Sequence, residues 1–261
     1  MLRYDVEWLI EYYGGEQPVR PGIPYSLLAT DFRVERRNAL FQLTRATNVE
    51  PRLEFDETVA RLVSLEAGVL RVQPCHYSDG IRSNYAMDGE GGLRAILRAQ
   101  YGRHLPPLDD ARLSNGIGTA IVVFDTRGKP YLPRRAPRQS VFPGGFHCTA
   151  SGEAIWRDDG EMFESHIRCE LEEEAGLARA DIHDVKMLAL CREFLRGGKP
   201  QIFFSAVTHL SSDELALRRR TAIAAQIRRG RQEILDEVLE ELTPETLAQC
   251  TLECRANLAL S

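Results

Sequence analysis

The sequence predicts an α/β fold, because segments of strand character alternate with a helical segment along its second half. Residues 115–133 predict a β-hairpin, since a β-branched and aromatic run is followed by a turn and a second apolar run. Residues 185–208 predict another hairpin, closed by a Gly-Gly turn. The acidic stretch between the hairpins predicts a helix that ends at Gly176, because glycine takes the left-handed conformation that terminates helices.

Further helices are predicted after the second hairpin. Ser211 and Glu214 have the spacing of a capping box, in which each side chain bonds the backbone of the other residue, so a helix begins there. Pro244 suits the first position of another helix. The predicted helical segments are residues 215–228, 234–242 and 244–258.

The first part of the chain predicts a separate α+β region. Residues 55–65, which contain two acidic residues near their start, and residues 93–101, closed by Gly102, predict helices. Residues 68–77 predict a strand.

A proline pair, Pro106-Pro107, followed by two aspartates marks the predicted domain boundary. It divides the chain into an N-terminal α+β region, residues 1–110, and a second domain, residues 111–261. The N-terminal region carries no motif with chemistry of its own. We expect it to act as a platform, as a lid over the site, or as a dimerisation element that would make the protein a homodimer.

Composition limits the classes of partner. The chain has 261 residues and a formal net charge of −5, and this mildly acidic balance gives no electrostatic footprint for nucleic-acid binding, which favours a basic surface. No apolar run reaches the ~18 residues of a membrane helix. The six cysteines have no C-x-x-C spacing, which predicts free thiols in a reducing cytoplasm. We therefore expect a cytoplasmic protein with neither nucleic-acid nor membrane partners.

Three glutamates carry the most specific chemistry. Glu170, Glu173 and Glu174 stand at i, i+3 and i+4, so on a helix they share one face. Like charges at this spacing repel each other. A hard divalent cation removes the repulsion, since Mg²⁺ prefers clustered carboxylate oxygens.

The surrounding residues resemble the Nudix hydrolase signature. Its pattern is Gly, five residues, Glu, seven residues, Arg-Glu, apolar, any residue, Glu-Glu, any residue, Gly, apolar. Here Glu161 is followed by seven residues, and the positions through Leu177 match except that Cys169 replaces the arginine. A Pro143-Gly144-Gly145 turn precedes this helical half, and strand, Gly-Gly turn and glutamate helix follow the Nudix order.

The loop half of the pattern is longer than in the family. Fifteen residues lie between Gly145 and Glu161 where the pattern has five, so the simplest account is a ten-residue insertion within residues 146–160. A second account takes Glu153 as the first glutamate and places the extra residues after it. In the family the arginine holds a glutamate in place, which Cys169 cannot do. Arg168 is no automatic replacement, because one helical step rotates it by about 100°.

The resemblance implies a fold, a reaction and a site. The implied fold is a Nudix-type α/β/α sandwich with a mixed sheet. The implied reaction is Mg²⁺-dependent hydrolysis, with Mn²⁺ as a substitute, of the pyrophosphate bond in a small nucleoside diphosphate derivative. The implied metal ligands are Glu170, Glu173, Glu174 and the Gly144 carbonyl, and either Glu173 or Glu174 would be the catalytic base.

Substrate binding is expected from Arg134, Arg135 and Gly145. The two arginines follow the first hairpin and suit phosphate oxygens. The alternative function is a Nudix-like module that binds or senses a nucleotide or nucleotide sugar with little turnover. Cys169 and the longer loop motivate this alternative.

Overall fold

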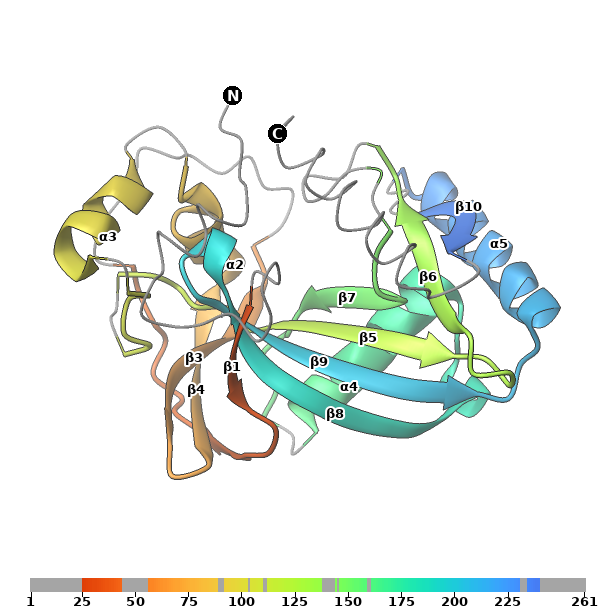
Figure 1. Cartoon of the computed structure of the whole chain (residues 1–261), viewed down its shortest axis with the longest axis horizontal. Helices are drawn as coiled ribbons and strands as arrows, with labels where there is room; N and C mark the ends of the chain where they lie inside the picture. The colour runs from red at the N-terminus through yellow and green to blue at the C-terminus, as the bar shows by residue number, and fades with distance from the viewer. Residues whose placement is uncertain are drawn as a thin grey trace.

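The structure, a computed structural model, confirms the mixed α/β class (Figure 1). It describes residues 25–43, 56–88, 92–102, 104–109, 112–137, 144, 146–158, 161–230 and 234–239. The predicted helix at residues 244–258 and the predicted substrate-binding residue Gly145 lie outside these residues.

The main sheet contains parallel and antiparallel pairs. Its strand order is β1-β8-β9-β5-β6-β10, and a further strand, β7, pairs with β5. Only β5 and β9 run parallel; the other pairs in this sheet are antiparallel. The bounds are β1 Tyr25–Ala29, β5 Gly118–Phe124, β6 Pro130–Arg135, β7 Ala150–Glu153, β8 Ile182–Glu193, β9 Lys199–Thr208 and β10 Ile234–Leu239. Both predicted hairpins, β5–β6 and β8–β9, are confirmed.

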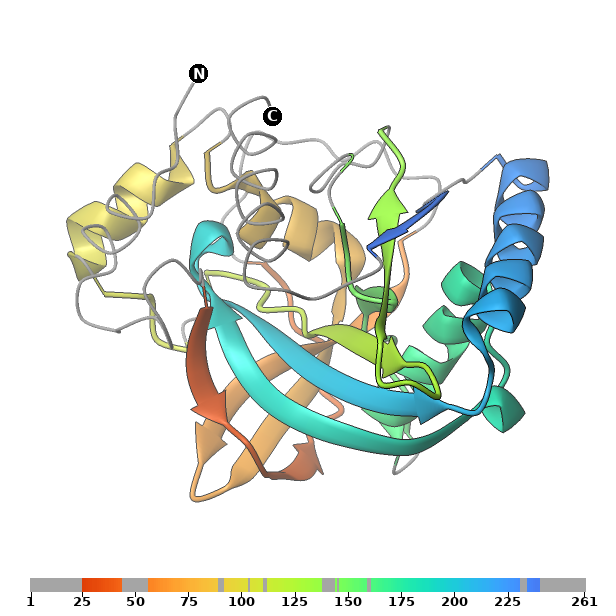
Figure 2. The same cartoon turned by 45° about the vertical axis from the view of Figure 1, so that its right-hand side comes forward.

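One edge of β5 is shared between two strands. Its first half pairs with β7 and its last two residues pair with β6, so β6 and β7 diverge from it (Figures 1 and 2). Thr149 fills the fork, because its hydroxyl accepts from the Val123 backbone N–H at 2.8 Å and donates to the Tyr131 carbonyl at 2.6 Å. Because β6 and β7 diverge, the glutamate helix can approach β7.

Helix α4 (Met162–Glu170) covers the core face of the sheet at β5 and β7. Its Ile167 is fully buried in one cluster with Ile121 of β5 and Ile202 of β9. Helix α5 (Ser212–Arg228) packs beside the end of the glutamate segment and β10. Its predicted capping box is confirmed, since Ser211 and Glu214 exchange hydrogen bonds.

The N-terminal part contains a three-stranded sheet of order β2-β4-β3. The predicted strand β4 and helix α3 are confirmed, but the predicted helix over residues 55–65 is wrong, because Thr58–Glu66 is strand β3. Val59 and Leu62 are buried in β3, and the contacts on both of its sides override the helical pattern. The bounds are β2 Arg33–Arg36, β3 Thr58–Glu66, β4 Val69–His76, α2 Tyr77–Ile81, η1 Asn84–Ala86 and α3 Leu93–Tyr101.

Contacts cross the predicted boundary at residue 110. Strand β1 pairs with β8 in the main sheet. The Ala60 backbone of β3 donates to the Ala154 carbonyl at 2.7 Å and accepts from the Ile117 N–H at 2.8 Å. Leu62 and Leu70 belong to the same core cluster as Ile117. The two-domain division stays a prediction, and a common core joins its two sides.

A helix predicted over residues 234–242 is also wrong, because Ile234–Leu239 forms strand β10 on the free edge of β6. An unpaired strand edge attracts a partner strand, and this pairing outweighs the local preference of the Glu-rich sequence for helix. Pro133 of β6 has no N–H to donate, which accounts for the irregular register there.

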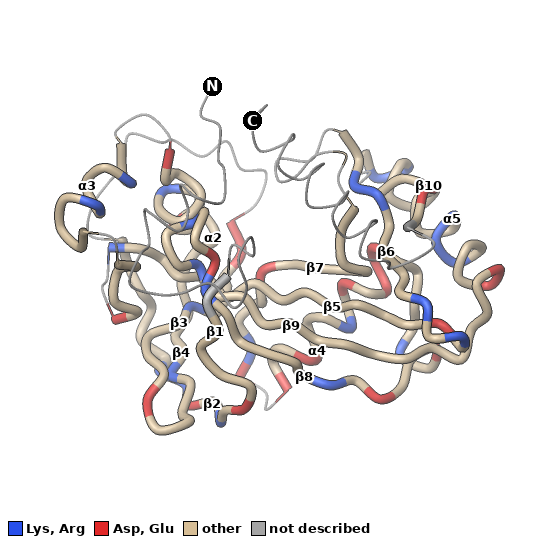
Figure 3. The backbone as a smooth tube through the Cα atoms, in the orientation of Figure 1, with Lys and Arg blue, Asp and Glu red and all other residues tan. Residues whose placement is uncertain are grey.

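The described cysteines Cys75, Cys148, Cys169 and Cys191 are free thiols. Basic and acidic residues are interspersed along β8 and α5 (Figure 3). No helix in the described part of the chain has both the length and the apolar character needed to cross a membrane.

Candidate active site at the glutamate helix and strand β7

The last turn of the glutamate helix is widened. Helix α4 continues as a π-helix, η2, over Leu171–Ala175, a form that often occurs at functional sites. The predicted stop is confirmed, since Gly176 has φ of 70° and the Leu177 N–H donates to the Leu171 carbonyl at 3.0 Å. A side chain at Gly176 would also meet the Arg218 carbonyl at 2.7 Å.

The wider turn separates the three predicted ligands. Glu174 is buried, at 5% exposed, and Glu170 is partly buried. Glu173 is exposed. The structure therefore brings Glu170 and Glu174 to one side and leaves Glu173 facing solvent, because the i→i+5 turn changes the phase of the helix after residue 170.

Both inward glutamates reach strand β7. The Glu174 Oε2 accepts a hydrogen bond from the Ser151 backbone N–H at 2.8 Å. Glu170 lies against the neighbouring residue, Gly152, where a methyl group would be 2.6 Å from its carboxyl carbon. The two carboxylates therefore meet the sheet at consecutive residues of one strand.

Gly152 is a residue that the sequence reasoning did not assign to the site. Only glycine lets the β7 backbone approach Glu170 and His166 this closely. The spacing contained a signal: eight residues separate Gly152 from Glu161, three more than the Nudix pattern requires, whereas Gly145 leaves an excess of ten. Gly152 and its neighbour Glu153 formed a Gly-Glu pair in the sequence, but Glu153 points to the other face of the sheet.

Gly144 and Arg134 are hydrogen-bonded to each other. The Gly144 carbonyl accepts from Arg134 Nη1 at 2.6 Å, and Arg134 Nε lies 2.9 Å from Glu237. The Arg134 guanidinium also stacks over the Phe146 ring at 4.6 Å. In this arrangement the carbonyl and the guanidinium form structural contacts between β6, β10 and the following loop.

Arg135 lies close enough to His147 to affect its charge. Burial, and then the Arg135 charge, lower the pKa of His147 to about 3. The Nε2 atom of His147 is 3.4 Å from the Ser151 hydroxyl, next to the residue that holds Glu174. Arg135 thus adds positive charge close to His147, which lies next to Ser151.

His166 precedes Glu170 by about one turn of the same helix. It is 4% exposed, and its Nε2 is 3.3 Å from Glu170 Oε1 without hydrogen-bond geometry. Burial, and then the charge of Arg157, lower the pKa of His166 to about 4. The imidazole is therefore neutral near pH 7 and does not neutralise the Glu170 charge.

Arg157 supplies positive charge beside Cys169. Its Nη2 is 3.9 Å from the sulfur of Cys169, the residue at the arginine position. Arg157→Ala is expected to raise the pKa of His166, because a nearby positive charge disfavours the imidazolium. An NMR titration of the His166 ring measures this shift. The exposed Arg179→Ala is the control, and an unchanged His166 titration in Arg157→Ala would contradict the assignment.

The buried His166 also predicts acid sensitivity. Its pKa is about 4 when folded and 6.5 by reference, so between these values the unfolded state binds more protons and stability falls as pH falls. The loss approaches about 1.4 kcal/mol per pH unit inside that window. Urea unfolding of His166→Gln from pH 7 to 4.5 should show a shallower decline than wild type. Parallel declines would show that His166 does not contribute.

The two inward glutamates supply carboxylates, a donor type that magnesium sites use. The described residues contain no ready cluster of three or more His, Cys, Asp or Glu side chains around one point. Mg²⁺ commonly takes one or two protein carboxylates together with waters and substrate phosphates. Glu170 and Glu174, fixed at consecutive residues of β7, meet that requirement.

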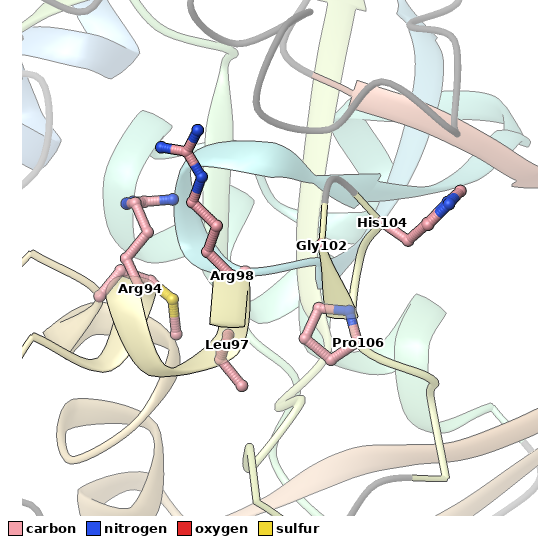
Figure 4. Close-up of a pocket in the computed structure, with 8 residues that line it drawn as sticks. Arg94, Leu97, Arg98, Gly102, His104 and Pro106 are labelled. Carbon is pink, nitrogen blue, oxygen red and sulfur yellow. The ribbon is translucent and has the colours of Figure 1, made fainter. Parts of the chain in front are cut away.

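A separate small pocket lies between α3 and the turn at Gly197 (Figure 4). Its lining includes Arg94, Arg98 and His104 but none of the site glutamates. Arg94 is engaged by Asp88 and by the Leu195 carbonyl at 2.6 Å. The cavity volume is about 10 Å³, room for about one water molecule, so this pocket is no substrate site.

Comparisons with known proteins give limited similarity. No protein-family model matches the chain, and no curated protein sequence matches it. Among solved structures, DR0079 from Deinococcus radiodurans is 17% identical over 53% of this chain and 82% of its own, with a TM-score of 0.31. The C. elegans Ap4A hydrolase is 12% identical over 55% and 93%, with a TM-score of 0.29. The MutT protein from Methanosarcina mazei Go1 is 13% identical over 55% and 94%, with a TM-score of 0.27. These values assign neither a family nor an activity to the chain.

Proposed function

We propose that the protein is a Nudix-type, divalent-metal-dependent hydrolase of the pyrophosphate bond in a nucleoside diphosphate linked to another group. The observation that carries the proposal is the meeting of Glu170 and Glu174 with consecutive residues of β7. The same glutamates belong to the stretch that resembles the Nudix signature. A diphosphate is strongly anionic, so its hydrolysis needs such a cation-binding arrangement.

Each glutamate has a distinct proposed role. Glu170 and Glu174 would hold Mg²⁺ or Mn²⁺, whose bound form neutralises phosphate oxygens and lowers the pKa of water. Glu173 is the exposed neighbour of Glu174 in the chain, and we assign to it proton acceptance from the attacking water. The neutral His166 packs against Glu170.

Hydrolysis of a defined panel tests this proposal. ADP-ribose, NADH, dinucleoside polyphosphates and nucleoside triphosphates are incubated with Mg²⁺ or Mn²⁺, and release of the nucleotide product is measured. We expect turnover of at least one diphosphate-linked compound, dependent on added metal. Turnover that persists in EDTA, or in Glu170→Gln and Glu174→Gln, would contradict it.

The second candidate is a sensor that binds the same ligands with little turnover. It is favoured by one observation: the Gly144 carbonyl, expected to complete the metal site, is bonded to Arg134. Thermal stabilisation by a panel compound with Mg²⁺, without product release over hours, would select the sensor over the hydrolase.

A further inference from the structure

The backbone carbonyl of Glu173 has lost both of the N–H donors that a helix would give it. In an α-helix this carbonyl would accept from the Leu177 N–H, and in a π-helix from the Ala178 N–H. The Leu177 N–H donates instead to the Leu171 carbonyl at 3.0 Å. The Ala178 N–H donates to Asp181 Oδ2 at 2.9 Å. Glu173 therefore needs a donor from elsewhere in the fold.

A side chain of helix α5 supplies this donor. Gln226 Nε2 donates to the Glu173 carbonyl at 3.2 Å, in a partly buried position. Gln226 is 6% exposed and belongs to the inward face of α5, together with Ala222 and Ile223. A carbonyl that is shielded from water costs free energy when it lacks a donor, so this bond stabilises the turn in which Glu173 lies.

Helix α5 is itself anchored to the fold. At its start, Ser212 Oγ donates to Asp125 Oδ2 at 2.8 Å, in the turn between β5 and β6. Farther along, Arg218 Nη2 lies 3.0 Å from Asp181 Oδ1. The α5 backbone also closely approaches the end of the glutamate segment (Figure 2), since a methyl group at Gly176 would lie 2.7 Å from the Arg218 carbonyl oxygen. Gln226 therefore acts from a fixed support.

The segment of Glu173 and Glu174 is thus held from two sides. On one side, Gln226 of α5 binds the Glu173 carbonyl. On the other side, the Ser151 N–H of β7 binds the Glu174 carboxylate at 2.8 Å. Buried apolar neighbours pack the same turn into the core. In this arrangement the Glu174 side chain is buried at β7 and the Glu173 side chain is exposed.

We propose that Gln226 is a positioning residue for the metal site, because its bond to the Glu173 carbonyl keeps the π-helical turn open. The open turn holds Glu170 and Glu174 at β7 and leaves Glu173 outside. Without Gln226, the carbonyl regains a donor, the Leu177 N–H, when the turn closes to α-helical bonds. Closing returns the three glutamates to one helix face. The inference rests on the proposed function in taking Glu170 and Glu174 as metal ligands.

A crystal structure of Gln226→Met tests the bond directly. Methionine is a flexible, unbranched side chain of similar shape that has no N–H group. We expect the Leu177 N–H to bond the Glu173 carbonyl in this variant, in place of the Leu171 carbonyl. Gln226→Leu serves if thermal unfolding shows that the methionine variant is not folded. A folded variant that keeps the wild-type bonds of the turn would overturn the inference.

Mn²⁺ binding, measured by electron paramagnetic resonance, links the turn to the site. Gln226→Met is expected to weaken binding by about tenfold or more, since Glu174 loses its position at Ser151. The matched control is Gln100→Met, an exposed glutamine of α3 that also donates a side-chain hydrogen bond, and it should keep wild-type affinity. Wild-type affinity in folded Gln226→Met would contradict a positioning role.

A second substitution distinguishes positioning from a general loss of stability. Glu173→Gln should change Mn²⁺ affinity by less than about twofold in the wild-type background, where this side chain is exposed. In the Gln226→Met background it should weaken binding by about threefold or more, because the closed turn brings Glu173 to the metal-binding face. Equal effects of Glu173→Gln in the two backgrounds would overturn the inference.

The outcomes separate this inference from the proposed function. Mn²⁺ binding that depends on Gln226, without hydrolysis of any diphosphate, would keep the positioning role and reject the hydrolase. Metal-dependent hydrolysis with the same Mn²⁺ affinity in wild type and Gln226→Met would keep the hydrolase and reject the positioning role. A wild-type protein that binds no Mn²⁺ would reject both.

Discussion

Gly152→Ala is expected to lower pyrophosphate hydrolysis by about 100-fold or more while leaving the protein folded. The added methyl group would lie 2.6 Å from the Glu170 carboxyl carbon and 2.8 Å from His166 Nε2. Both are far ends of side chains, so they can move aside and spare the fold. Displacing a metal-binding carboxylate by about 1 Å is enough to cost that factor in rate.

Steady-state kinetics on the best panel substrate measure the effect, with circular dichroism to confirm folding. Gly80→Ala is the matched control, because a methyl group there meets its neighbours at ordinary contact distances of 3.5 Å. Full activity in Gly152→Ala would mean that the approach of β7 to Glu170 is unimportant for the reaction.

Glu174→Gln is expected to reduce kcat/KM by about 10²–10³. The amide oxygen of glutamine can still accept the Ser151 N–H bond, so the local structure is kept. The substitution removes the negative charge that would hold the cation. A catalytic cation stabilises the transition state by several kcal/mol. Each 1.36 kcal/mol of activation free energy changes the rate by about tenfold. Glu172→Gln, an exposed neighbour in the same turn, should keep wild-type rates.

The comparison of Glu174→Gln with Glu173→Gln separates metal binding from proton transfer. Loss of Glu174 should raise the metal concentration needed for half-maximal rate. Loss of the exposed Glu173 should lower kcat at saturating metal. The reverse pattern would exchange the two roles.

Several elements of the second half were predictable because local signals agreed with the final contacts. The Ser211 capping box, the Gly176 stop and the two hairpins each depend on residues close in sequence. Strands β3 and β10 were assigned to helix. Strand β10 pairs with β6, which is distant in the sequence. Strand β3 pairs with the adjacent β4, and its other side is bridged to the distant residues Gly116 and Ile155.

The candidate site shows the same limit. The glutamates and the helix stop were visible in the sequence, but the π-helix that turns Glu173 outward follows from packing around Leu171 and Ala175, both fully buried. Gly152 was not assigned, because its importance comes from contact with His166 and Glu170 across the fold.

Mn²⁺ binding measured by electron paramagnetic resonance tests the central claim most directly, because it needs neither substrate nor turnover. We expect wild type to bind Mn²⁺, and Mg²⁺ to compete for the same site. The Glu170→Gln/Glu174→Gln double variant should lose that binding by at least tenfold, while Glu172→Gln keeps it. Equal Mn²⁺ binding by wild type and the folded double variant would contradict the claim that these two carboxylates at β7 hold the metal.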